Sequence, residues 1–512
     1  MKKYILLLAF GIFHLTSFAQ ISEKQIDELV EKTLTSFNVP GIAVAVVKDG
    51  KIIHSKGYGV KSILTKEKVD ANTLFGIASN SKAFTTAALA ILVDENKIKW
   101  DDKVVQYIPD FKMYNDYVTN EFTIRDLLTH RSGLGLGAGD LMIWPDGSDF
   151  TANDIVHNLQ FLKPVSGFRT KFDYDNLLYA VAGKVIEKVT GKSWTNFIEQ
   201  RILEPLEMKK SAGSFVTLKD TTNVIMPHVP VNGKLKIIAR YKNQILDAAG
   251  GIYSSVNDMS QWMIMQLNKG KYGANLENKL FTEKQQKEMF QLQTILPIGT
   301  RPPYNSHFNG YGLGWFLKDV KGYKEASHTG GLEGIVTQTT LYPELNLGIV
   351  VLTNQQSGAA FNAITNTIKN AYLDIPFVDY VEMYSKAEKE NSATVDKTVD
   401  AVWETVNKNA KNAVVDLKKY VGTYTDDWFG DIVISEKKGK LYFSSKRSQK
   451  LAGEIFYYKE NEFVVKWNNR AFNADAFLTF SENNTNIKMK AVSETTDFSY
   501  DFQDLNFNLI KK

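Results

Sequence analysis

The chain has 512 residues, a formal net charge of +4 and a hydrophobic content of 44%. This length allows two or three domains, and the near-neutral charge gives no electrostatic case for nucleic-acid binding. The sequence contains no cysteine, which excludes a disulfide framework, a thiol nucleophile and a cysteine-ligated metal site.

The first nineteen residues are typical of a secretory signal peptide. Lys2 and Lys3 form a positive start, residues 4–13 are apolar, and Ala19 ends a small-residue pattern that a signal peptidase reads. The alternative, a membrane anchor, is disfavoured because the apolar run is too short to cross a bilayer easily. We therefore predict a signal peptide over 1–19, a periplasmic or secreted protein, and no integral membrane segment after cleavage.

Residues 20–375 are predicted to form an α/β domain, in which helices flank one antiparallel sheet and a helical lobe is inserted between its two halves. The expected strands are 41–47, 51–58, 311–316, 334–341 and 347–352, and the expected helices are 79–92, 177–190, 194–203, 256–267 and 359–372. A cleft where the sheet and the lobe meet is a natural ligand site.

A composition shift marks the end of this domain, because all twelve prolines lie at or before Pro376. Residues 376–416 are charged and mixed, and we predict a partly helical linker there. Residues 417–512 alternate short β-rich runs with turn residues, at 431–435, 440–443, 454–458, 462–467, 476–480 and 486–492. This rhythm predicts a small antiparallel barrel, which we expect to modulate access or specificity.

Ser79 and Lys82 are three residues apart, so a helix would place them on one face. A serine hydroxyl is a poor nucleophile at neutral pH, and Lys82 could accept its proton if burial lowers the lysine pKa. The alternative for Ser79 is a helix N-cap. A second Ser-x-x-Lys match at 435–438 falls in a predicted strand and turn, and we treat it as chance.

Tyr174 and Asn176 lead into a clear helical pattern. A phenol near a lysine can relay protons, and an amide two residues later can orient both the lysine and a substrate carbonyl. The alternative is a turn tyrosine packed under the helix. Tyr241 and Asn243 match the same spacing, but residues 171–173 give Tyr174 the better context.

His328, Thr329, Gly330 and Gly331 follow a predicted strand. Glycines let a substrate approach a strand edge closely, and the N–H groups of Gly331 and Ser79 could bind an oxyanion. We expect His328 to orient substrate or share protons, and a purely structural histidine is the alternative.

The segment 123–134 is predicted to be a helix that ends at a glycine, with His130 and Arg131 as cations at its C-terminal end. We interpret it as scaffold under the cleft. The remaining histidines show no metal-ligand spacing, so we expect neither a metal nor a cofactor.

In this order the three motifs resemble the serine β-lactamase and penicillin-binding protein superfamily, most closely its class C branch of β-lactamase-like esterases and D-amino-acid peptidases. The resemblance covers about residues 22–375 and includes 248–255. It implies that Ser79 is the acylated nucleophile, with Lys82 as its base partner. It also implies that Tyr174 shares the base role and protonates the leaving group, while Asn176 positions substrate.

One departure concerns His328, because class C β-lactamases usually carry lysine at that place. Histidine, with an ordinary pKa of about 6.5, is mostly neutral at pH 7 and holds a substrate carboxylate poorly. Efficient β-lactam turnover is therefore not expected. The terminal region resembles the lipocalin-like barrel appended to some of these hydrolases, on its strand rhythm and its 420–424 opening.

Together these features predict an exported serine hydrolase that forms an acyl-enzyme on an amide, peptide or ester. Its substrate would be a small molecule or peptide, with cell-wall fragments as one source, and a D-stereospecific peptidase is a close alternative. The alternative from another class is a weakly or non-catalytic penicillin-binding-type protein, whose terminal barrel captures a ligand or partner.

Overall fold

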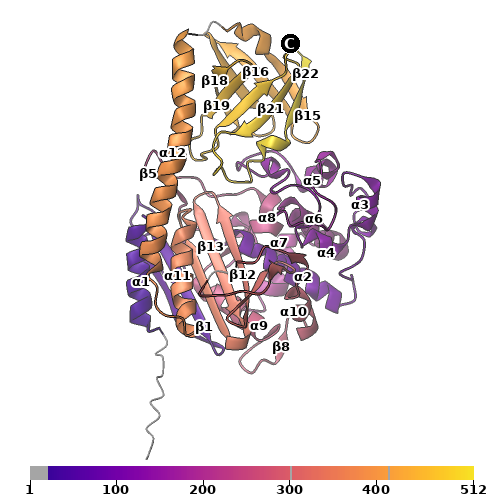
Figure 1. Ribbon diagram of the computed structural model, residues 1–512. Coiled ribbons are helices and arrows are strands. Elements are labelled where there is room, and N and C mark those ends of the chain that lie inside the picture. The colour runs from indigo at the N-terminus through magenta and orange to yellow at the C-terminus, as the bar shows by residue number, and fades with distance from the viewer. Residues whose placement is uncertain (1–20, 300–301, 413–414, 512) are drawn as a thin grey trace, which may run out of the picture.

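The computed structural model describes residues 21–299, 302–412 and 415–511. The predicted signal peptide at 1–19 lies outside the described residues. The described chain forms an α/β domain and a terminal barrel, joined by one long helix that runs beside both (Figure 1).

An eight-stranded antiparallel sheet lies at the centre of the first domain, in the order β2-β1-β14-β13-β12-β11-β10-β9. Its strands are β1 (Gly41–Lys48), β2 (Lys51–Gly59), β9 (Thr294–Ile295), β10 (Asn309–Tyr311), β11 (Phe316–Val320), β12 (Tyr323–Leu332), β13 (Ile335–Tyr342) and β14 (Leu347–Thr353). Strand β1 pairs with β14, so the two ends of the domain meet as predicted. The predicted strand 311–316 is instead the connection between β10 and β11, where Gly314 has a φ of 81°.

Both faces of the sheet are covered, which explains the uninterrupted apolar run of β1. Its side chains alternate, so that Val44 and Val46 pack toward α1 (Glu23–Ser36) and α11 (Gly358–Tyr372). The intervening Ala45 faces the other layer, which includes α9 (Val256–Leu267).

The inserted lobe is mainly helical and lies on the opposite side of the sheet from α1 and α11 (Figure 1). Its helices are η1 (Ala78–Asn80), α2 (Ser81–Asp94), η2 (Val104–Gln106), α3 (Asp116–Glu121), α4 (Ile124–Leu127), η3 (Asp140–Met142), α5 (Ala152–Asn158), η4 (Leu159–Phe161), α6 (Leu177–Thr190), α7 (Trp194–Ile198), η5 (Glu199–Leu203), η6 (Phe215–Thr217), η7 (Gln244–Leu246), α8 (Asp247–Gly250) and α10 (Glu283–Met289). Short strand pairs join β3 (Phe75–Gly76) to β6 (Tyr253–Ser254), β4 (His228–Val231) to β5 (Lys234–Ile237), and β7 (Lys271–Tyr272) to β8 (Asn278–Lys279). Helix α2 is buried from Ser81 to Leu92, which its many alanines permit.

The linker region forms α12 (Tyr380–Asn412), a helix of 33 residues. It leads into a closed antiparallel barrel made of β15 (Gly422–Asp426), β16 (Gly430–Lys437), β17 (Lys440–Ser445), β18 (Ala452–Lys459), β19 (Glu462–Trp467), β20 (Ala476–Phe480), β21 (Asn486–Ala491) and β22 (Asn506–Lys511). The turns η8 (Pro343–Leu345), η9 (Leu417–Tyr420) and η10 (Phe502–Asp504) complete the element order. Aromatic rings pack inside the barrel, with Phe443 and Trp467 at 5.3 Å between centroids and Phe463 and Phe480 at 5.5 Å. Packed side chains therefore occupy this part of the barrel interior.

The barrel docks on the helical lobe through polar contacts. Arg447 forms ion pairs with Asp149 at 2.7 Å and with Asp154 at 3.1 Å. Asn158 Nδ2 donates to the carbonyl oxygen of Trp428 at 2.8 Å. These contacts hold one end of the barrel over the lobe.

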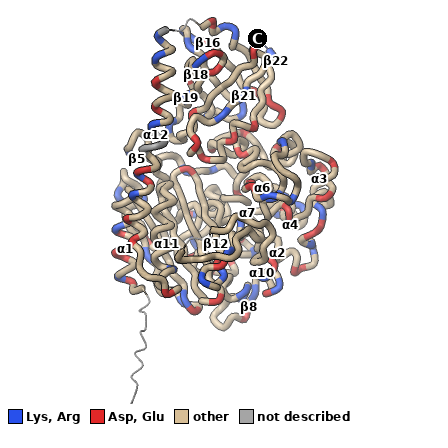
Figure 2. The backbone as a smooth tube through the Cα atoms, viewed as in Figure 1, with Lys and Arg blue, Asp and Glu red and all other residues tan. Residues whose placement is uncertain are grey.

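Charged residues of both signs are interspersed along both domains (Figure 2). Among residues 21–299, 302–412 and 415–511, no helix is both long and apolar enough to cross a membrane.

Candidate active site

Ser79 lies in the tight turn η1, directly before α2. The prediction that it occupies the first turn of an α-helix is corrected, because α2 begins only at Ser81. Ala78 has a φ of 51°, a left-handed conformation that costs a non-glycine residue about 1 kcal/mol. Polar contacts hold the turn, since Asn80 Nδ2 donates to Thr337 Oγ1 at 2.9 Å and Thr337 Oγ1 donates to the Ile77 carbonyl at 2.8 Å. The turn that carries the nucleophile candidate is thus fixed to the sheet through the Asn80 side chain and the Ile77 carbonyl.

Gly330 makes this close approach of η1 to β12 possible. A Cβ atom at Gly330 would lie 2.4 Å from the Ile77 carbonyl oxygen and 2.5 Å from Thr337 Oγ1. No larger residue fits without moving η1. Gly330 therefore has a packing role that the sequence reasoning did not predict, beside its expected role in substrate binding.

Lys82 is fully buried and points at Ser79. Its Nζ lies 3.1 Å from Ser79 Oγ, 2.7 Å from Asn176 Oδ1 and 3.0 Å from the carbonyl oxygen of Ala249. Burial lowers the pKa of Lys82 to about 7, and the charges of Asp140 and Asp175 oppose this shift. A large share of Lys82 is therefore an uncharged amine at neutral pH.

The partners of Lys82 decide where its lone pair points. Asn176 Nδ2 donates to Asp140 Oδ2 at 2.7 Å, so the amide presents its oxygen to Lys82. The Ala249 carbonyl also only accepts. A neutral amine has two protons, which satisfy these two oxygens, and its lone pair then faces Ser79 Oγ. The arrangement prepares Lys82 to remove the hydroxyl proton of Ser79.

Tyr174 lies beside this pair. Its ring centroid is 4.8 Å from Lys82 Nζ. Burial raises the pKa of Tyr174 well above its usual value, and the Ser79 side chain opposes this shift. The phenol therefore keeps its proton in the resting site and can donate it.

His130 lies directly under Tyr174, with 4.1 Å between the stacked ring centroids. Its Nδ1 accepts from the backbone N–H of Asp175 at 3.0 Å. Burial, with the charge of Lys82, lowers the pKa of His130 well below its usual value. The prediction of a helix over 123–134 with His130 as a cation at its end is therefore wrong, because α4 ends at Leu127 and burial keeps His130 neutral, although its location under the cleft is as expected.

Asp175 lies between Tyr174 and Asn176 and caps the start of helix α6, which begins at Leu177. Its Oδ1 accepts from the backbone N–H groups of Leu177 at 2.9 Å and Leu178 at 3.4 Å. This capping fixes the turn from which Tyr174 and Asn176 project in different directions. Burial raises the pKa of Asp175 to about 7.

The His328 motif lies within β12 rather than after a strand, which corrects the predicted boundary. Thr329 and Gly331 are exposed and line the cavity, whereas His328 is 1% exposed. The histidine Nδ1 contacts the Thr329 carbonyl at 2.6 Å, and its Nε2 contacts the Tyr311 hydroxyl at 2.9 Å. Burial, with the charge of Lys82, lowers the pKa of His328 to about 3, so this side chain is neutral.

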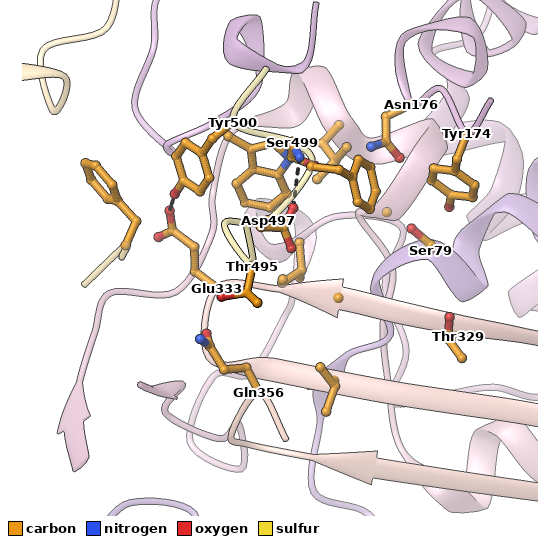
Figure 3. A pocket seen from close by; sticks show the side chains of 18 of the residues that line it. Ser79, Tyr174, Asn176, Thr329, Glu333, Gln356, Thr495, Asp497, Ser499 and Tyr500 are labelled. Carbon is orange, nitrogen blue, oxygen red and sulfur yellow. Dashed lines mark hydrogen bonds between the residues drawn. The ribbon is translucent and has the colours of Figure 1, made fainter. Parts of the chain in front are cut away.

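A cavity of about 610 Å³ opens in front of Ser79 (Figure 3). The first domain contributes Ser79, Trp144, Phe172, Tyr174, Asn176, Leu246, Gly250, Phe316, His328, Thr329, Gly331, Leu332, Glu333, Val336 and Gln356 to its lining. The terminal domain contributes Ala471, Phe472, Asn473, Thr495, Asp497, Phe498, Ser499 and Tyr500. The sequence reasoning missed this second group, which carries no motif and lies far along the chain.

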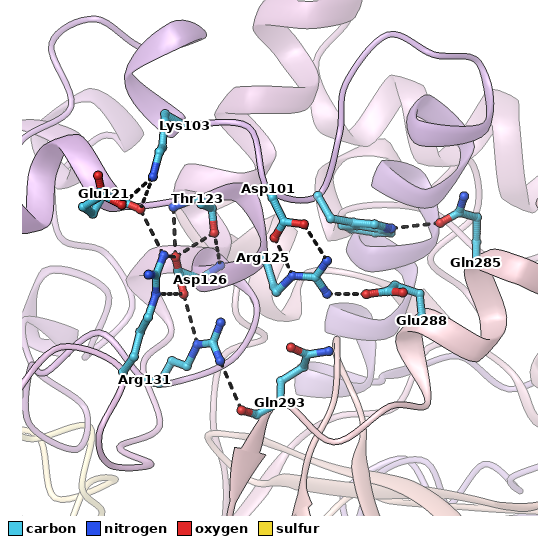
Figure 4. Close-up of polar contacts among 12 residues, drawn as sticks. Asp101, Lys103, Glu121, Thr123, Arg125, Asp126, Arg131, Gln285, Glu288 and Gln293 are labelled. Atoms are coloured by element: carbon cyan, nitrogen blue, oxygen red, sulfur yellow. Dashed lines mark hydrogen bonds and ion pairs between the residues drawn. The ribbon is translucent and has the colours of Figure 1, made fainter.

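A polar network supports the segment that leads to His130 (Figure 4). Asp126 is buried and accepts from Arg131 Nε at 3.0 Å and from Thr123 Oγ1 at 2.6 Å. Arg131 also donates to the Gln293 carbonyl at 3.1 Å. Arg131 is therefore occupied in holding the scaffold.

Neither of the two rejected motif matches lines the cavity. Ser435 belongs to strand β16 of the barrel, and the ring of Tyr241 packs against Trp144 at 4.9 Å. Within the described ranges, no group of three or more His, Asp or Glu residues is arranged to hold a metal ion.

Comparison with known families gives two matches. A family model described as Beta-lactamase matches residues 26–373, and a model described as a domain of unknown function, DUF3471, matches residues 407–508. Among similar proteins is the unguisins hydrolase ungD' of Aspergillus campestris, 27% identical over 458 residues, which are 86% of this chain and 83% of that protein. Protein flp of Staphylococcus aureus strain MW2 is 28% identical over 348 residues, which are 66% of this chain and 64% of that protein.

Solved structures share the fold. The octameric penicillin-binding protein homologue of Pyrococcus abyssi aligns over 94% of this chain and 99% of its own, with a TM-score of 0.61 and 21% identity. A class C beta lactamase of Rhodobacter sphaeroides aligns over 68% and 99%, with a TM-score of 0.55 and 18% identity. At these identities the likeness concerns the fold, and it confirms the predicted α/β class.

Proposed function

The chain belongs to the beta-lactamase family, as its motifs predicted, and we propose that it is an exported serine hydrolase that works through an acyl-enzyme. Ser79 is the nucleophile and Lys82 is its base. The contact that carries this proposal is the 3.1 Å approach of the buried Lys82 Nζ to Ser79 Oγ.

In the acylation step, the lone pair of Lys82 accepts the hydroxyl proton as Ser79 Oγ attacks the carbonyl carbon of the substrate. The N–H groups of Ser79 and Gly331 stabilise the resulting oxyanion. Tyr174 then gives its phenolic proton to the leaving group, and the Lys82 ammonium restores that proton. Water releases the acid in the second half of the reaction, with the same groups acting in reverse.

The lining of the cavity favours an ester, or a peptide with no free carboxylate at the site, over a β-lactam as the main substrate. His328 has a pKa of about 3 and is neutral, so it cannot replace a lysine that binds a carboxylate. The charged residues that line the cavity are the acids Glu333 and Asp497. A substrate carboxylate would therefore meet no Lys or Arg partner among the described residues of this lining.

The relatives support the general class, because one of them is named a hydrolase. The substrate of this chain is proposed to be a small molecule or peptide, which includes cell-wall fragments. Residues 1–19 are proposed to direct export to the periplasm or beyond, and mass measurement of the secreted protein would test the cleavage after Ala19.

Covalent labelling tests the hydrolase proposal. Wild type should react with a fluorophosphonate probe and hydrolyse p-nitrophenyl acetate, and Ser79→Ala should lose both activities. Ser435→Ala is a matched control, because it removes the serine of the second Ser-x-x-Lys match, and it should label like wild type. Absence of labelling in wild type, or equal labelling of Ser79→Ala, would favour the alternative of a non-catalytic binding protein.

A further inference from the structure

A loop of the terminal barrel, residues 493–501, enters the serine site from the connection between β21 and β22 (Figure 3). The Phe498 ring meets the Tyr174 ring edge-on, with 5.8 Å between centroids. Gly137 permits this approach, because a Cβ atom there would lie 2.6 Å from the Phe498 carbonyl oxygen. The loop therefore packs closely against Tyr174 and Gly137 of the first domain.

Ser499, from this loop, contacts a buried carboxyl group behind the site. Its Oγ lies 2.9 Å from Asp140 Oδ2, and Asn176 Nδ2 donates to the same oxygen at 2.7 Å. Asp140 is 0% exposed, and its other oxygen has no hydrogen-bond partner in the described part of the chain. Asp140 Oδ2 therefore links Ser499 of the terminal domain to the Asn176 amide of the first domain.

The same loop also fixes the backbone on both sides of Asp140. Asp501 accepts from the N–H of Gly139 at 2.6 Å and from the N–H of Leu141 at 2.9 Å. The terminal domain thus holds both the side chain and the main chain of Asp140.

We propose that Ser499 is a positioning residue of the serine site, which acts through Asp140 to keep the oxygen of the Asn176 amide toward Lys82. The inference rests on the proposed hydrolase function. If the amide turned over, its NH₂ group would face Lys82 and compete for the lone pair of the amine. Lys82 would then be a poorer base for Ser79, while the substrate cavity would keep its shape.

Ser499→Ala tests this role in the full-length protein. The acylation rate with p-nitrophenyl acetate should fall about 10- to 100-fold, as expected for a misplaced catalytic group, while KM changes less than about twofold. Ser448→Ala is the matched control: it removes another buried barrel serine, whose hydroxyl has no partner in the described chain, and should leave the rate unchanged. Ser499→Thr, which keeps a hydroxyl, should recover at least part of the rate.

A double-mutant comparison shows whether Ser499 acts through Asp140. Asp140→Ala and the Ser499→Ala/Asp140→Ala variant should have equal rates, whereas independent contributions would multiply and overturn the proposal. If Asp140→Ala does not fold, Ser499→Ala and Ser499→Thr decide the question. A wild-type rate in Ser499→Ala also overturns it. An inactive wild type would instead remove the hydrolase function itself.

Discussion

Gly330→Ala should displace the nucleophile without touching any reactive group. The new Cβ atom would stand 2.4 Å from the Ile77 carbonyl oxygen. Real Cβ atoms essentially never approach another heavy atom closer than 3.0 Å. To bring this separation to 3.0 Å, the two atoms must move apart by about 0.6 Å, and to reach ordinary van der Waals contact they must move apart by about 1 Å. The atom that must retreat belongs to the turn that carries Ser79, so the hydroxyl moves with it.

A misplacement of about 1 Å can cost about 100-fold in rate, and overpacking typically costs about 1–3 kcal/mol of stability. We therefore expect kcat/KM for a model ester to fall about 100-fold in Gly330→Ala, measured by stopped-flow absorbance. Urea unfolding should show that the variant is still folded under the assay conditions. Gly358→Ala is a control, because its Cβ would meet only the Phe361 ring at an ordinary 3.7 Å. A Gly330→Ala variant with wild-type rate and stability would refute the reasoning.

Two further predictions concern the proton path. The kcat/KM for an uncharged ester should rise about tenfold per pH unit below pH 7 and level off above it, because Lys82 has a pKa of about 7 and is a base only when deprotonated. A profile that is flat from pH 5 to 8 would contradict Lys82 as the base. Tyr174→Phe should lower the acylation rate about 100- to 10,000-fold with little change in the urea midpoint, and a variant as fast as wild type would remove the phenol from the relay.

Elements with strong local signals were predicted closely. Helix α6 spans the predicted 177–190, because Asp175 caps its start and Gly191, with a φ of 70°, ends it. Strands β19 and β20 also have the predicted bounds, since turn residues flank their apolar runs. In both cases the residues that set the ends of the element are adjacent in the chain, so they can be read from one sequence.

Features that depend on distant contacts were not predicted. The turn at Ser79 is not α-helical because Thr337 and Gly330 of the sheet hold it, and neither residue is near it in the sequence. Asp140 and Ser499 have no motif, and 359 positions separate them. The charge state of His130 follows from burial under Tyr174, which helix-end rules do not consider.

The cavity wall formed by Phe498, Ser499 and Tyr500 has a consequence for biosynthesis. Ribosomes add about 5–20 residues per second, so the chain that carries Ser79 exists for about 20 to 80 s before this wall is translated. During that interval the nucleophile lacks one side of its enclosure. The order of translation thus delays completion of the pocket until residues 498–500 have been added.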